Sequence, residues 1–240
     1  ECGGPVRQDE ASCPSCGIDR RGAWSVDPFV GRTIARKYRI ERRIASGASG
    51  PILEATQVHQ DVDLGKVVIR MMTRLASEDD LGPASRFMEE ARAARTLAGP
   101  HALRVFDVDL DAGHVPYLVQ EYLDGEPLSR IIERSGRLEP RRAIAIALQV
   151  AEGIEEAHGK RILHTSLKPS NVIVLDRQGG DFVKILGMGT SAHGAPPRGA
   201  AGRATDSSCI APEQASGGRV DERTDIFALG VVLPELLAGA

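Results

Sequence analysis

The sequence lacks a charge excess of either sign, and it lacks any long apolar run. Its 240 residues include 30 Lys and Arg against 33 Asp and Glu, which gives a formal net charge of −3. This balance provides no electrostatic reason to bind nucleic acid or an anionic membrane. The longest apolar candidate, Ile226 to Leu237, is shorter than the roughly 18–20 residues of a membrane span and contains Pro234. We find no secretory signal, and we expect a cytoplasmic fragment without a membrane segment.

Cysteine is also scarce, and three of the four cysteines lie within the first sixteen residues. The segments C-G-G from residue 2 and C-P-S-C-G from residue 13 resemble the two knuckles of a zinc ribbon, in which thiolates of tight turns bind a tetrahedral Zn²⁺. We expect Cys2, Cys13 and Cys16 to bind zinc, with the fourth ligand upstream of Glu1. The alternative is a disulfide or unrelated free thiols, which the missing secretory signal disfavours.

The length suits one medium domain with a small appendage. Residues 1–20 are predicted to form the partial zinc-ribbon-like segment, 21–36 a polar linker and 37–240 the main folded domain. The chain starts at Glu1 rather than Met and stops at Ala240 within a helical pattern. We therefore expect it to be a fragment of a longer protein.

Hydrophobic periodicity divides the main domain into a strand-rich first half and a helix-rich second half. Alternating or buried-strand patterns cover residues 38–44, 67–70, 105–110 and 116–122, with a helical pattern over 85–97. Helices are predicted over 127–135 and 140–158, followed by a hairpin of 171–175 with 182–186. The order predicts a two-lobed α+β fold.

A series of motifs then follows in one order. It comprises A-S-G-A-S-G at 45–50, V-V-I-R at 67–70, a helical Glu at 90, a hinge-like Q-E-Y-L at 120–123, H-T-S-L-K-P-S-N at 164–171, A-P-E at 211–213 and D-I-F-A-L-G at 225–230. From about residue 38 to 240 the chain resembles a bacterial Hanks-type serine/threonine protein kinase domain. This resemblance implies a five-stranded antiparallel N-lobe with helix C. It also implies a mainly helical C-lobe that is truncated after helix F.

The resemblance implies a nucleotide site with several altered positions. Arg70 replaces the strand-three Lys, and we expect it to pair with Glu90 for a structural purpose. Val68 replaces the Ala above the adenine, and overpacking there costs about 1–3 kcal/mol. ATP binding is therefore expected to be weak or independent of Mg²⁺. The residues implied for the nucleotide site are Ile44, Gly47, Gly50, Ile52, Val68, Arg70, Glu90, Glu121, Leu123 and Ile173.

The catalytic positions differ most from the family pattern. Ser166 stands where the resemblance implies the catalytic Asp, and a hydroxyl is not a carboxylate base. Gly187 stands at the position of the metal-binding Asp, which leaves Asn171 as a poor Mg²⁺ site by itself. Lys168 is retained, while Thr165 replaces the Arg that reads a phosphorylated activation loop.

These departures predict a pseudokinase, which is a kinase-like signalling module that binds a protein partner. One alternative is an active or atypical serine/threonine kinase that transfers the γ-phosphate of ATP, with an acid such as Asp181 moving in to hold metal. Another is a nucleotide sensor that binds ATP without Mg²⁺. Titration with ATP in the presence and absence of Mg²⁺ discriminates among the three.

Overall fold

The computed structural model describes residues 27–47, 49–60, 62–73, 82–188 and 209–239. The chain divides into two compact units, which are treated separately below. The first unit contains Glu1–Met88 and Val105–Tyr122, and the second contains Glu89–Arg104 and Leu123–Ala240.

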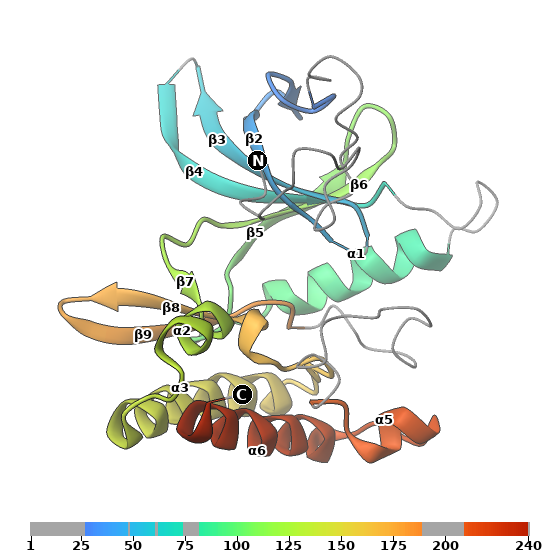
Figure 1. The fold of residues 1–240 in the computed structure, drawn as a ribbon. Helices are drawn as coiled ribbons and strands as arrows, with labels where there is room; N and C mark the ends of the chain where they lie inside the picture. Colours follow the sequence, from blue (N-terminus) through green and yellow to red (C-terminus); the bar gives the residue numbers. More distant parts are fainter. Residues whose placement is uncertain (1–26, 48, 61, 74–81, 189–208, 240) are drawn as a thin grey trace, which may run out of the picture. The chain divides into compact units, whose positions relative to one another are not determined.

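The first unit is built on an antiparallel sheet with the strand order β1-β2-β3-β4-β6-β5 (Figure 1). Its strands are β1 (Thr33–Ile34), β2 (Tyr38–Ser46), β3 (Pro51–His59), β4 (Val62–Met71), β5 (Val105–Leu110) and β6 (Pro116–Glu121). Strands β2 to β6 are the five that the resemblance implied. The two-residue β1 adds a sixth strand, and it lies in the stretch 21–36 that was predicted to be a linker.

Side chains alternate across this sheet and build the core of the first unit on one face. Leu53 of β3 and Ile69 of β4 are fully buried and lie opposite each other in the ladder. Tyr38 and Tyr117 pack edge to face with ring centroids 6.5 Å apart, and the Tyr38 hydroxyl donates to Asp107 Oδ2 at 3.2 Å. The polar end of Tyr38 is thus satisfied while its ring remains in the core.

The second unit combines helices with a small sheet of order β7-β8-β9. The part of helix α1 (Gly82–Arg95) that begins at Glu89 belongs to this unit. The other elements are β7 (Glu126–Pro127), α2 (Leu128–Ser135), α3 (Pro140–Gly159), the 3₁₀ turn η1 (Pro169–Asn171), β8 (Val172–Arg177), β9 (Gly180–Ile185), α5 (Pro212–Ser216) and α6 (Glu222–Ala238). The predicted helices over 127–135 and 140–158 and the predicted hairpin are confirmed.

Helix α3 is the central packing element of the second unit, because it contacts both α6 and β9. Its buried face includes Ile146, Val150 and Ile154. The side chain of Gln149 donates to Asp181 O at 3.1 Å and accepts from Val183 N–H at 3.0 Å. These bonds satisfy two backbone groups of β9, and they fix the hairpin to the helix.

No helix within the described ranges has both the length and the apolar character needed to cross a membrane.

Candidate functional site

The backbone of the loop at residues 164–171 is hydrogen-bonded to one buried carboxylate of α6. Asp225 accepts the backbone N–H of His164 at 2.8 Å and that of Thr165 at 2.6 Å. It also accepts the Nε2–H of His158 from α3 at 2.8 Å. Three donors compensate the burial of this carboxylate, so the loop conformation is tied to α3 and α6.

His164 is a structural residue of this loop. Its ring is fully buried, and its Nε2 lies 2.9 Å from Leu186 O. Because a carbonyl only accepts, Nε2 carries the proton and Nδ1 accepts the Ser166 N–H at 3.2 Å. Burial lowers the pKa of His164, against an opposing contribution from Asp225. The neutral ring thereby bridges the loop and the end of β9.

The structure brings Ser166, Lys168 and Asn171 together in one turn. The Asn171 side-chain amide donates to Ser166 O at 2.8 Å, and the Asn171 N–H donates to Lys168 O at 2.9 Å. Leu186 N–H donates to Asn171 O at 2.8 Å, which places the next residue, Gly187, beside this turn. Gly187 has φ +81°, a left-handed conformation. The side chains at these positions therefore offer a hydroxyl, an ammonium and an amide, but no carboxylate.

Asp181, the acid considered as a substitute metal ligand, is already engaged. It accepts from Arg142 Nε at 2.7 Å and from Arg142 Nη2 at 2.9 Å. This bidentate pair holds the Asp181 carboxylate of β9 against Arg142 of α3. Within the described ranges, no group of three or more His, Cys, Asp or Glu side chains is arranged to hold a metal ion.

In the first unit, the loop between β2 and β3 is folded closely against the end of β4. Gly47 N–H donates to Gly50 O at 2.8 Å, and Thr73 N–H donates to Ser49 O at 3.0 Å. A Cβ at Gly50 would lie 2.5 Å from Met71 O and 2.8 Å from Thr73 Oγ1. Glycine at position 50 is thus required by local packing, whether or not a phosphate approaches the loop.

The predicted nucleotide residues of this sheet share a face. Ile52 pairs with Arg70 across β3 and β4, and both alternate with the buried core residues Leu53 and Ile69. Val68 lies on the same side as Arg70, two residues away along β4. Ile44 lies within the second register shift of β2, between Arg43 and Ala45, and is exposed.

Glu54 is a charged residue of the same sheet that the sequence motifs did not indicate. It pairs with Val68, and its side chain is only 5% exposed. Burial acts to raise its pKa, but the neighbouring Lys66 (2.8 Å) and Arg42 lower it below the ordinary value. The Lys66 ammonium also lies 4.9 Å from the centroid of the Tyr122 ring. The one available sequence signal was an acid inside the apolar strand pattern P-I-L-E-A.

The remaining predicted site residues are distributed over both units. Glu121 ends β6 and pairs with Val67, whereas Leu123 and Ile173 belong to the second unit, where Ile173 pairs with Pro127. Arg70 and Glu90 belong to different units, so their ion pair stays a prediction. The proposed zinc ligands Cys2, Cys13 and Cys16 lie outside the described residues.

Comparison with known proteins identifies the class of domain to which this loop and sheet belong. The protein kinase domain family matches residues 38–240, so the chain belongs to the protein kinase family. It is 34% identical over 220 residues to serine/threonine-protein kinase pkn3 of Myxococcus xanthus, covering 89% of this chain and 40% of the relative. It is 30% identical over 211 residues to serine/threonine-protein kinase PrkC of Bacillus subtilis, covering 88% of this chain and 32% of the relative.

The fold is shared with a solved kinase domain. The crystal structure of the Mycobacterium tuberculosis PknI kinase domain matches with a TM-score of 0.67 and 25% identity, covering 88% of this chain and 77% of that one. The predicted two-lobed protein-kinase-like fold is confirmed. The chain spans less than half the length of these curated relatives.

Proposed function

We propose that this domain is a kinase-like signalling module that binds a protein partner and is impaired in phosphoryl transfer. The supporting observation is that, within one loop, the residues that fix the backbone differ in their retention from the residue at the position of the catalytic base. Asp225, His164 and Asn171 hold the loop in a defined conformation, while the position of the catalytic base carries Ser166. The residues that shape the loop are retained, whereas the group that reacts is replaced.

The side chains present do not suit the Mg²⁺ ion that protein kinases use. Mg²⁺ requires near-octahedral oxygen coordination and is usually bound through carboxylates. Gly187 supplies no side-chain oxygen, and Asn171, whose amide nitrogen donates to Ser166 O, offers a neutral amide oxygen rather than a carboxylate. Loss of a general base costs about 10²–10⁴-fold in rate. The two changes act on different steps of the reaction, so each lowers transfer by its own mechanism.

The nucleotide position of the first unit is altered as well. Val68 adds volume where the family has Ala. Overpacking at this position costs about 1–3 kcal/mol, which disfavours a bound adenine. We therefore infer that ATP binds weakly, and that any binding does not require Mg²⁺. Zinc would belong to the N-terminal ribbon, with Cys2, Cys13 and Cys16 as ligands.

The main alternative is a weakly active or atypical serine/threonine kinase. Its support is the intact frame and the kinase names of the relatives. In that case Arg70 substitutes for the Lys, and protein serine or threonine residues are the substrates. The composition gives no support for nucleic acid or membrane as a partner, and a cytoplasmic location fits the proposal.

Thermal denaturation of the purified protein with ATP, in the presence and absence of Mg²⁺, tests these alternatives. We expect little shift with ATP, and the same shift when Mg²⁺ is added. A Mg²⁺-dependent rise, accompanied by transfer of the γ-phosphate that Lys168→Ala or Arg70→Ala abolishes, would overturn the proposal. A clear rise that is equal with and without Mg²⁺ would indicate a nucleotide sensor instead.

A further inference from the structure

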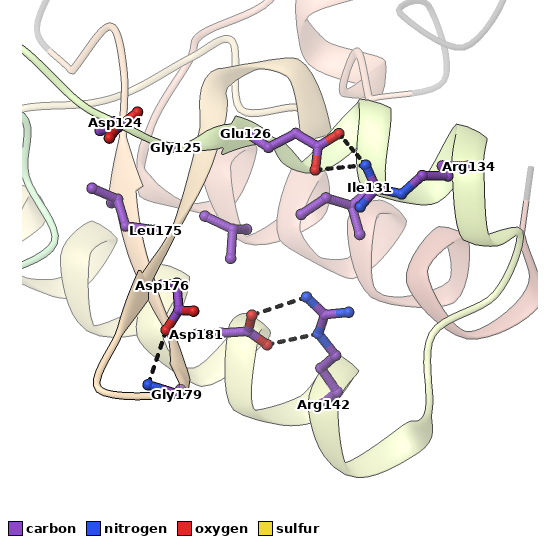
Figure 2. Close-up of a pocket in the computed structure, with 12 residues that line it drawn as sticks. Asp124, Gly125, Glu126, Ile131, Arg134, Arg142, Leu175, Asp176, Gly179 and Asp181 are labelled. Atoms are coloured by element: carbon purple, nitrogen blue, oxygen red, sulfur yellow. Dashed lines mark hydrogen bonds and ion pairs between the residues drawn. The ribbon is translucent and has the colours of Figure 1, made fainter.

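A cavity of about 730 Å³ opens in the second unit, between α2, the beginning of α3 and the β8–β9 hairpin (Figure 2). It lies wholly within this unit. Its apolar lining comes from Ile131 of α2 and from Val174 and Leu175 of β8. Ile131 and Val174 are buried, and Leu175 is partly exposed. This volume falls within the range of ligand sites, so the cavity can accept one or two apolar side chains.

Two ion pairs border the apolar lining (Figure 2). Arg134 Nη1 donates to both oxygens of Glu126, at 2.6 and 2.9 Å. Arg142 binds Asp181 bidentately, and its pKa is raised mainly by this hydrogen bonding, with a further contribution from Glu126. Both guanidinium groups are therefore already neutralised by carboxylates of the same cavity. Neither is available as a dedicated anion site.

Two further acids, Asp124 and Asp176, lie at the border outside both ion pairs. Both residues are exposed, and Asp176 Oδ1 accepts the Gly179 N–H at 2.9 Å. Four carboxylates and two guanidinium groups leave the cavity lining with a formal charge of −2. The cavity thus attracts cationic groups and repels phosphates, nucleic acid and anionic lipid.

Gly125 keeps the acidic segment close to β8. A Cβ at this position would lie 2.7 Å from Val174 O and 2.8 Å from Ile173 Cγ2. A larger residue would push the neighbouring Asp124 and Glu126 away from the strand. Glycine here therefore sets the width of the cavity and the position of its carboxylates.

We propose that this cavity is a docking site for a peptide segment of a protein partner, in which Lys or Arg side chains flank a leucine-like side chain. The apolar side chain fills the space between Ile131 and Leu175, and the cationic groups lie against Asp124 and Asp176. The inference rests on the proposed protein-binding role and names the chemistry of the partner. It does not depend on ATP binding or on the loss of phosphoryl transfer.

The test is fluorescence anisotropy with a labelled synthetic peptide of alternating Lys, Leu and Arg. One comparison peptide replaces each Lys and Arg with Glu, and another replaces each Leu with Ser. The test variant is Asp124→Asn/Asp176→Asn, which keeps an oxygen acceptor for Gly179 N–H. The control variant is Glu155→Gln/Glu222→Gln, which removes the same charge from exposed positions of α3 and α6.

We expect saturable binding of the basic peptide that weakens with salt, and about five- to tenfold weaker binding by the Asp124/Asp176 variant. The control variant and the wild type should bind alike, and both comparison peptides should bind poorly. Absence of saturable binding, equal binding by the two variants, or equal binding of the Glu peptide would each overturn the docking site. Because phosphoryl transfer is measured separately, the docking site and the proposed function can fail independently.

Discussion

At the residue scale, Thr165 shows how the second unit holds a β-branched residue in a backbone conformation that such residues disfavour. Thr165 has φ +58°, in the left-handed region that β-branched residues strongly disfavour. Its N–H donates to Asp225 at 2.6 Å, and its carbonyl accepts from Gln214 Nε2 at 2.7 Å. These bonds fix the backbone from both sides. The strain, of order 1–3 kcal/mol, is therefore maintained by α5 and α6.

Replacing Thr165 with Asn should stabilise the protein, because Asn tolerates left-handed backbone much better than a β-branched residue does. We expect a gain of about 1 kcal/mol, which for a protein of this size is about 2–4 °C in Tm. Thermal and urea denaturation measure the effect. Thr165→Val is the control, since it keeps the branched Cβ, and it should give no gain. If the Asn variant is less stable than the Val variant, the strain argument is wrong.

At the element scale, α3 contains a glycine whose role is decided by packing rather than by helix propensity. A Cβ at Gly153 would lie 2.7 Å from Ile185 Cδ1 and 3.0 Å from His101 Cβ. Ile185 is fully buried on β9 and has little room to move. By contrast, Gly230 in α6 is exposed and has no neighbouring atom within 4 Å among the described residues. The two glycines occupy similar helical positions in different surroundings.

Ala substitution should therefore have opposite effects at the two positions. Gly153→Ala should destabilise by about 1–3 kcal/mol through overpacking, despite the better helix propensity of Ala. Gly230→Ala should stabilise by about 0.5–1 kcal/mol. Urea denaturation monitored by circular dichroism measures both, and each variant is the control for the other. Stabilisation by both substitutions would show that β9 can move away from α3.

At the scale of the whole molecule, each unit has its own core, and each contains positions where the residue differs from the one that the kinase resemblance implies. Arg70 and Val68 lie in the first unit, and Ser166 and Gly187 lie in the second. The hydrogen bonds of Asp225 and Asn171 show that the backbone of residues 164–171 is organised without a carboxylate at positions 166 and 187. A carboxylate introduced at position 166 would thus be attached to a backbone that is already fixed by hydrogen bonds.

The combined variant Arg70→Lys/Ser166→Asp/Gly187→Asp should gain Mg²⁺-dependent phosphoryl transfer. Ser166 is exposed, and Asp tolerates the left-handed backbone at Gly187 better than most residues. We expect a rate at least about 10²-fold above the wild type, measured by transfer of labelled γ-phosphate. The matched control is Arg70→Lys/Ser166→Asn/Gly187→Asn, which has similar shape but no added charge. Equal transfer by the wild type and the restored variant would contradict the proposed impairment.

Much of the fold could be predicted from the sequence, because apolar periodicity reports directly which face of an element is buried. The helices over 127–135 and 140–158 and the 171–186 hairpin agree with α2, α3, β8 and β9. The strand β3 was not named as a separate segment, and β1 was assigned to a linker. A two-residue strand carries too few alternating positions to show a period.

The candidate site was predicted only in part. The order of the motifs indicated Ser166, Lys168 and Asn171, and the structure brings these three together in one turn. Glu54 was missed, because an acid within the pattern P-I-L-E-A does not by itself show that its cationic partners lie on the neighbouring strands. Asp181 was considered as a metal ligand, whereas its position on β9 places it against Arg142 of α3.

The sequence by itself determined the kinase-like order of elements and the absence of carboxylates at positions 166 and 187, since both are properties of residue identity and spacing. Only the tertiary structure decided what the remaining polar groups do. Distance and burial commit Asp181 to Arg142 and Gly125 to the surface of β8. These assignments depend on contacts between residues far apart in the chain, and local sequence contains no record of such contacts.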